Sequence, residues 1–286
     1  MAFFKNYLTN LRGASEKLRI FNAGLNKLDI FDAAIEGCTW VFHVAHPMDV
    51  SGNESEETVT ERAVQGTLAI LKACLSSKTV KRVVHTSSSV TCTFNRKDQG
   101  ETEESTWTNI DFYKSFGPSI SSFVCSKTKT ERAALEFAEK NGLDLVTLIL
   151  PVVFGPFICP NPPNSVLMAM AMILGKEDYY KFILNSNFVY VDDVASAYIF
   201  LLEHPDAKGR YICSSNVITL HKMAEFLSAK YPEFQIPTAD VLDKVEYYIF
   251  PSLSSKKLLD SGFRFKYGLD GMFEGAIQCF REKGLI

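Results

Sequence analysis

The sequence predicts an α/β protein with a doubly wound parallel sheet, followed by a smaller α/β domain in the C-terminal half. Short runs rich in Val, Ile, Leu and Phe alternate with longer segments of helical periodicity in the first half of the chain. This alternation is typical of parallel strands joined by crossover helices. The texture changes at 156–163, where four prolines in eight residues indicate an extended loop.

The expected strands are apolar on both faces, as buried parallel strands are. They span 18–22, 40–45, 80–86 and 144–151. The expected helices between them span 29–36, 56–75 and 126–140, each with an apolar face or a terminating glycine. In the C-terminal half we expect helices at 191–203 and 220–230 and a strand at 209–213. We therefore divide the chain into a domain at 1–155 and a substrate domain at 156–286, some elements of which return to the sheet.

Composition excludes several classes of function. Hydrophobic residues make up 47% and charged residues 22% of the 286 residues, which is the globular range. A net charge of -3 argues against nucleic-acid or anionic-membrane partners. The apolar runs fall short of the ~20 residues that a membrane-spanning helix needs. The seven cysteines are scattered, which argues against a metal site and for reduced thiols in a cytoplasmic protein.

Two segments carry the residue types needed for carbonyl chemistry. Thr86, Ser87, Ser88 and Ser89 lie at the carboxyl end of an expected strand, and Lys127 lies in the next expected helix. Ligands of open α/β sheets bind at the carboxyl ends of strands, so a hydroxyl and a lysine there suit a reacting carbonyl group. Turn formation by the serines and a solvated lysine is the plainer alternative, and the residues alone leave both open.

A resemblance extends over nearly the whole chain. It is carried by FHVAHPMD (42–49), LKACLSSKTVKRVVHTSSS (71–89), GPFICPNPPNS (155–165) and YVDDVASAYIFLLEHPDAKGRYICSS (190–215). These segments resemble the plant extended short-chain reductases, the family of the dihydroflavonol and vestitone reductases. The resemblance implies a Rossmann-like fold and an NADP cofactor. It also implies reduction of a ketone or aldehyde on a small phenolic or flavonoid-like molecule.

The resemblance also implies roles for individual residues. In this family a Ser, a Tyr and a Lys act on the carbonyl group, with the Tyr four residues before the Lys. Ser88 and Lys127 match the Ser and the Lys, and Phe123 stands at the Tyr position. Phenylalanine has no hydroxyl, and loss of a positioned general acid costs about 10²–10⁴ in rate. We therefore expect impaired activity or a non-catalytic binding protein. Cys125 and Tyr113 are the nearest other donors.

A second departure concerns the cofactor's phosphates. The family begins with a strand and a Gly-x-x-Gly-x-x-Gly loop that leads into a helix, and the sequence shows neither. We expect the sheet to lack its first two strands, which leaves 18–22 without a neighbour and 40–45 with a bare edge. We interpret the missing strands as an incomplete translation of a longer gene or as a decayed copy; an upstream segment with the glycine loop would restore the cofactor site but not the tyrosine at position 123. The sequence does not distinguish NADP from NAD, nor does it give the substrate or the oligomeric state.

Several positions still match the family's cofactor site. Besides Lys127 they are Val44, Ala45, Leu150, Pro151, Val152, Val153 and Ser165. Without the resemblance, the apolar members of this set are ordinary core residues. We interpret His46 as a neutral substitution without an orienting partner. The acids of the Tyr190–Asp193 motif are expected to cap the helix that follows.

Overall fold

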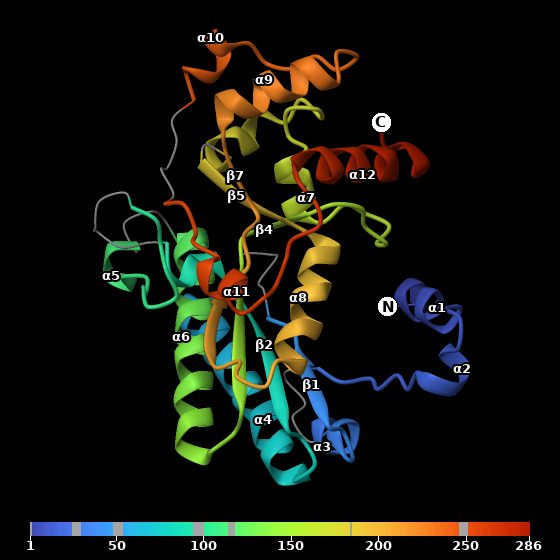
Figure 1. Cartoon of the computed structure of the whole chain (residues 1–286), viewed down its shortest axis with the longest axis vertical. Coiled ribbons are helices and arrows are strands. Elements are labelled where there is room, and N and C mark those ends of the chain that lie inside the picture. Colours follow the sequence, from blue (N-terminus) through green and yellow to red (C-terminus); the bar gives the residue numbers. More distant parts are fainter. Residues whose placement is uncertain are drawn as a thin grey trace.

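The computed structural model (Figure 1) describes residues 2–24, 30–47, 54–93, 100–113, 118–183, 185–245 and 251–286. Within these residues the strands form two sheets. The main sheet occupies the lower half of Figure 1 and the smaller sheet the upper half. Helices α1 (Ala2–Thr9) and α2 (Ala14–Lys17) lie to one side, apart from both sheets.

The main sheet is parallel throughout, as the strand–helix alternation predicted. Its order is β1 (Trp40–His43), β2 (Arg82–Ser88), β3 (Leu145–Leu150) and β6 (Gly209–Ile212). All six residues of β3 are buried, because it is a central strand with both faces covered. The register places His43 beside His85, and Ser88 beside Leu150. The carboxyl ends of β2 and β3 therefore meet at one edge of the sheet.

Helices cover both faces of this sheet, which makes it doubly wound. Helices α4 (Glu56–Ser77) and α6 (Pro118–Asn141) pack on one face, where Leu71 and Ala134 share a core with Val83. Helix α8 (Val191–Glu203) covers the other face, where Leu201 packs with Val84. Side chains alternate between the faces of a strand, so adjacent residues of β2 serve two different cores.

The second sheet holds the C-terminal core. It consists of β4 (Val152–Phe154), β5 (Asn185–Tyr190) and β7 (Asn216–Thr219), with β5 parallel to β4 and antiparallel to β7. Around it lie helices α7 (Asn164–Ala169), α9 (Leu220–Lys230) and α12 (Leu269–Glu282). Phe154, Phe188 and Phe273 pack against one another at its centre.

The remaining elements are short. They are α3 (Ile30–Ile35), α5 (Ile110–Tyr113), α10 (Ala239–Leu242) and α11 (Lys256–Asp260), with the 3-10 turns η1 (Ser89–Thr91) and η3 (Glu177–Phe182). Strand β6 lies in the main sheet although it follows the proline-rich loop, whereas β4 precedes that loop and lies in the second sheet. The division at residue 155 therefore stays a prediction.

The structure corrects two sequence expectations. Residues 18–22 form no strand, because no described strand lies where they could pair, and an isolated extended segment gains no ladder of hydrogen bonds. Asp193 does not cap its own helix. Its buried carboxylate accepts hydrogen bonds from the backbone N–H groups of Lys266 (2.9 Å) and Tyr267 (3.2 Å), and so ties α8 to the segment before α12.

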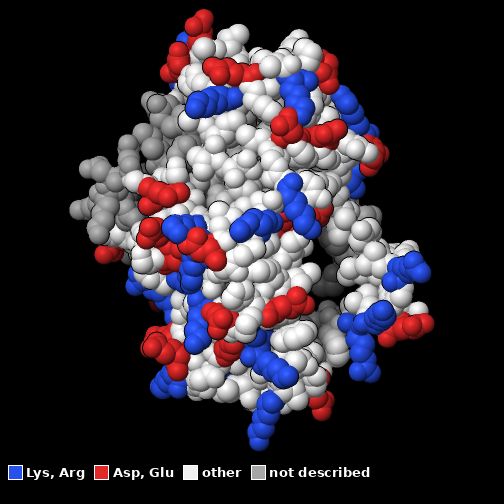
Figure 2. Space-filling view, in the orientation of Figure 1, with Lys and Arg blue, Asp and Glu red and all other residues white. Residues whose placement is uncertain are grey.

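Lysine, arginine, aspartate and glutamate side chains are interspersed over the face shown in Figure 2. Among the described helices, none is long and apolar enough to cross a membrane.

Candidate functional site

The candidate site lies at the carboxyl end of β2, near the face of the main sheet on which α6 packs. Ser88 is the last residue of β2, and it is half-buried beside Leu150 of β3. Its hydroxyl makes no hydrogen bond to any described residue and does not cap the η1 turn that follows. A hydroxyl with unused hydrogen-bonding capacity at a strand end is available to a ligand.

Lys127 lies on α6, four residues after Phe123, so the two side chains share one face of the helix. Lys127 is 8% exposed, and no hydrogen bond or ion pair joins it to another residue of the described ranges. Burial lowers the pKa of Lys127 to about 8, and the carboxylate of Glu131 opposes this shift. The ammonium group is therefore a donor of unused capacity in a poorly hydrated place.

Histidines from β1, β2 and the segment after β1 interact electrostatically with Lys127. The rings of His43 and His85 are 4.8 Å apart, because the parallel register pairs these two residues. Burial lowers the pKa of His43 to about 4 and that of His85 well below its ordinary value, and the charge of Lys127 lowers both further. All of these imidazoles are thus neutral at pH 7. Nε2 of His43 lies 3.0 Å from Oγ1 of Thr67 on α4.

His46 differs from the sequence interpretation. Its Nε2 lies 3.1 Å from Oγ of Ser126, and its ring meets that of Phe123 edge-on at 6.2 Å between centroids. Burial lowers the pKa of His46 to about 3, with smaller contributions from Lys127 and His43. The expectation of a histidine without an orienting partner is therefore wrong. Ser126 is the partner, and it precedes Lys127 on α6.

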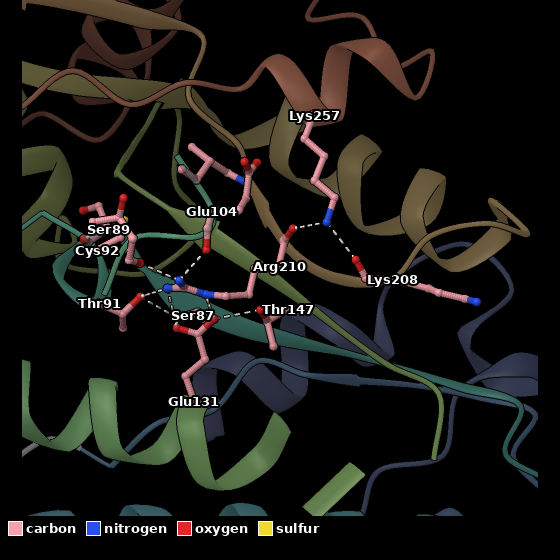
Figure 3. Close-up of polar contacts among 12 residues, drawn as sticks. Ser87, Ser89, Thr91, Cys92, Glu104, Glu131, Thr147, Lys208, Arg210 and Lys257 are labelled. Carbon is pink, nitrogen blue, oxygen red and sulfur yellow. Dashed lines mark hydrogen bonds and ion pairs between the residues drawn. The ribbon is translucent and has the colours of Figure 1, made fainter. Parts of the chain in front are cut away.

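A buried polar network joins the end of β2 to α6 (Figure 3). The carboxylate of Glu131, one helical turn after Lys127, accepts hydrogen bonds from Ser87 (2.7 Å) and Thr147 (2.7 Å). Arg210 of β6 donates to the same carboxylate at 3.0 and 3.2 Å, and Glu131 is 0% exposed. The network therefore holds the strand that ends in Ser88 against the helix that carries Lys127.

Arg210 also fastens the segment 100–108 to the sheet. Its guanidinium donates to the backbone oxygens of Glu104 and Thr106, at 2.6 Å each, and lies 3.7 Å from the centre of the Trp107 ring. The sequence analysis did not single out this network. Its directly bonded members can be far apart in sequence, as Thr91 and Arg210 are at 119 residues, so no local pattern marks them.

The other candidate positions fall into two places. Val44 is 58% exposed and Ala45 is also exposed, just past the end of β1. Leu150 is the last residue of β3 and pairs with Ser88, and Pro151 follows it. Val153 and Ser165 instead line a cavity of about 1040 Å³, together with residues of α8 and α12. Ser88, Phe123 and Lys127 are not among the residues that line that cavity.

Three further candidate positions remain. Val152 lies in β4 and is half-buried against the C-terminal core, so it is in part a core residue. Cys125 is fully buried on α6. The side chain of Tyr113 lies outside the described part of the structure, so its interpretation as a donor stays untested.

The architecture is that of a known family. The model of the NAD dependent epimerase/dehydratase family matches residues 6–213. The chain belongs to this family. Vestitone reductase of Medicago sativa is 49% identical over 281 residues, which cover 98% of this chain and 86% of that protein. Protein BRI1-5 ENHANCED 1 of Arabidopsis thaliana is 49% identical over 286 residues, covering 98% and 78%.

A further relative and two solved structures that are similar to this chain are also reductases. Dihydroflavonol 4-reductase of Callistephus chinensis is 40% identical over 282 residues, covering 98% of this chain and 77% of that protein. The crystal structure of alfalfa vestitone reductase superposes with a TM-score of 0.89 at 48% identity, covering 98% and 88%. Yeast methylglyoxal/isovaleraldehyde reductase Gre2, complexed with NADPH, has a TM-score of 0.78 at 22% identity, covering 98% and 89%. That last likeness concerns the fold alone. The expected Rossmann-like fold is confirmed.

Proposed function

We propose that this protein reduces a ketone or aldehyde group on a phenolic, flavonoid-like small molecule with NADPH. The observation that carries the proposal is the 49% identity to vestitone reductase over 98% of the chain. A dihydroflavonol reductase at 40% identity over the same share supports the substrate class. The fold supports it further, because the Ser88 hydroxyl, which has no hydrogen-bond partner among the described residues, lies at the carboxyl end of a strand of a parallel sheet.

The residues present fit the nicotinamide end of such a cofactor. Bound there, NADPH supplies a hydride to the carbonyl carbon. The Lys127 ammonium, which has no partner among the described residues, is suited to hold a ribose hydroxyl. The exposed backbone at Val44 and Ala45 and the strand end at Leu150 and Pro151 would flank the ring. We assign no residue to the phosphates.

Ser88 donates a hydrogen bond to the substrate's carbonyl oxygen in this proposal. Its hydroxyl carries no competing hydrogen bond from the described residues, so binding requires no exchange of protein partners. Val153 and Ser165 would contact the cofactor or the substrate from the cavity between β4 and α12. The domain at 156–286 would then supply the substrate side of the site.

A second candidate is a binding protein without turnover, and Phe123 is the observation that favours it. At the position of the family's tyrosine, a phenyl ring can neither donate nor accept a proton. We expect the reduction rate to fall about 10²–10⁴-fold below that of a relative with tyrosine there. Both candidates bind the cofactor and differ only in turnover.

A cytoplasmic location is part of the proposal. Burial raises the pKa of the Cys74 and Cys92 thiols to about 12 and also raises that of Cys213. Such buried thiols are inert packing groups. Their use as core residues supports a reducing compartment.

Titration of the purified protein with NADPH tests the proposal. Bound ligand at 100 times its dissociation constant stabilises the folded state by about 2.7 kcal/mol, which a thermal melt detects. Reduction of aromatic ketones by the stabilised protein would establish the function. Stabilisation by NADPH without any alcohol product favours the binding protein without turnover. A folded protein that NADPH does not stabilise contradicts both the reductase and the binding protein.

A further inference from the structure

The cavity of about 1040 Å³ lies between the end of β4, the proline-rich loop and α12. Small-molecule sites in proteins typically measure about 300–1,000 Å³, so this space can hold an organic molecule of several rings. Most residues of its wall are apolar, among them Val153, Phe157 and Val166. Two exposed apolar side chains, Tyr7 on α1 and Ile158 in the loop, also line it. A large cavity with such a wall suits an aromatic ligand.

Tyr190 belongs to the cavity wall because two glycines leave room for its side chain. A Cβ at Gly155 would lie 3.0 Å from the tyrosine ring, and a Cβ at Gly275 would lie 3.0 Å from the tyrosine hydroxyl. The ring also stacks on that of Tyr267, with 4.1 Å between centroids. These contacts fix the ring, and with it the hydroxyl, between the loop and α12.

Three polar side chains of the wall have no hydrogen-bond partner among the described residues. They are the hydroxyls of Ser165 and Tyr190 and the carboxylate of Asp192. A hydroxyl can donate and accept a hydrogen bond, whereas a carboxylate only accepts. The wall therefore offers unused capacity to a ligand that itself both donates and accepts.

The charges of the wall select a neutral ligand. Asp192, Glu282 and Lys283 line the cavity, which gives two negative charges and one positive charge. This balance opposes the phosphates of a nicotinamide cofactor. An ammonium group only donates, so it would leave the hydroxyl hydrogens of Ser165 and Tyr190 without an acceptor. A phenol meets all of these conditions, because it donates and accepts and is neutral below a pKa near 10.

We propose that the cavity binds a neutral phenolic molecule rather than the cofactor. Asp192 accepts a hydrogen bond from a phenolic hydroxyl, and Tyr190 and Ser165 donate to oxygen atoms of the ligand. The apolar wall takes the aromatic rings. This deepens the proposed function, on which the link between the cavity and reduction rests.

The cavity begins close to the strand end of the candidate site. Val153 of its wall follows Leu150 by three residues, and Leu150 is paired with Ser88 in the main sheet. Three residues of chain span at most about 11 Å. In the reductase, a substrate whose rings lie in the cavity would therefore extend its carbonyl group toward Ser88.

The test measures direct binding by isothermal titration calorimetry at pH 7. The probes are the trihydroxyflavanone naringenin and its unsubstituted parent flavanone, each with and without NADP⁺, which cannot reduce them. The variants are Asp192→Asn, Tyr190→Phe and the matched control Asp240→Asn. Asp240 is exposed in the first turn of α10, as Asp192 is in α8, and it does not line the cavity. Melting curves establish that each variant folds.

We expect naringenin to bind about 10-fold more tightly than flavanone, because its hydroxyls form hydrogen bonds with the wall. Asp192→Asn weakens naringenin about 3–10-fold and leaves flavanone unchanged, since flavanone has no hydroxyl to donate. Tyr190→Phe weakens both probes about 3–10-fold, and Asp240→Asn weakens neither. The comparison of the two probes on the wild type needs no variant to fold.

Three results overturn the phenol site, whatever the rate of ketone reduction. They are the absence of naringenin binding, equal affinities for naringenin and flavanone, and an Asp192→Asn variant that binds naringenin as the wild type does. Competitive displacement of naringenin by NADP⁺ assigns the cavity to the cofactor and also overturns it. If the expected binding is found but NADPH yields no alcohol from any bound ketone, the reductase function fails and the phenol site stands.

Discussion

Replacing Arg210 with methionine removes the cation that faces the buried carboxylate of Glu131. The two side chains are 7% and 0% exposed, and their closest atoms are 3.0 Å apart. Loss of one partner leaves the other charge buried without compensation, which costs about 3–5 kcal/mol. Arg210 also holds the oxygens of Glu104 and Thr106, which places the expected cost toward the upper end of that range.

The assay is equilibrium unfolding in urea, followed by circular dichroism, for Arg210→Met, Glu131→Gln and the double variant. In a parallel thermal melt, a loss of about 5 kcal/mol at roughly 2–4 °C per kcal/mol lowers the melting temperature of Arg210→Met by about 10–20 °C. The double variant should lose less than the sum of the two single changes, by about 0.5–3 kcal/mol, because the charges are removed as a pair.

A matched surface pair supplies the control. Arg281 and Glu233 lie 2.9 Å apart with 55% and 48% of their side-chain surfaces exposed. Arg281→Met removes the same chemistry from a solvated place, where ion pairs contribute at most about 1 kcal/mol. If Arg210→Met destabilises the protein no more than Arg281→Met does, the reasoning that the network holds β2 against α6 is refuted.

Three further changes have definite expected outcomes in urea unfolding. Asp193→Asn weakens the hydrogen bonds from the backbone N–H groups of Lys266 and Tyr267, so we expect the free energy of unfolding to fall by about 1.5–3 kcal/mol. An unchanged urea midpoint would contradict the role of Asp193 in tying α8 to the segment before α12. Gly155→Ala should lower the free energy of unfolding by about 1–3 kcal/mol or more, because φ is +144° and a new Cβ would lie 3.0 Å from the Tyr190 ring. An unchanged free energy of unfolding would contradict this expectation. Lys127→Met should stabilise the protein at pH 7 by up to about 3 kcal/mol, because the folded-state pKa lies below the unfolded one. That advantage should shrink as the pH rises from about 8 to 10.5, where the wild-type lysine becomes neutral in both states, and a constant difference argues against it.

Elements with a strong local signal were predictable from the sequence. Helices 191–203 and 220–230 have the expected limits, and the strands expected at 40–45, 144–151 and 209–213 are present with slightly shorter bounds. Helix α6 begins at Pro118, eight residues before the expected start. Its first turns are rich in serine, which has only modest helix propensity, while proline suits the first position of a helix.

Features that depend on distant partners were not predictable. Residues 18–22 have the β-propensity of a strand, but a strand exists only beside another strand. His43 and His85 become neighbours through the register of β1 and β2, which no local pattern encodes. Lys127 was a candidate from its position in the expected helix together with the family resemblance. Its surroundings were not predictable, because Glu131, the carboxylate one helical turn away, is bonded to residues of three other strands.

The most direct test of the reductase function follows a labelled hydride. Purified protein is incubated with an aromatic ketone of the flavonoid type and NADPH that carries deuterium at the transferable position, and the products are analysed by mass spectrometry. We predict an alcohol with one deuterium on the carbinol carbon, formed with a single stereochemistry. Unchanged ketone in the presence of demonstrably bound NADPH would contradict the proposed function.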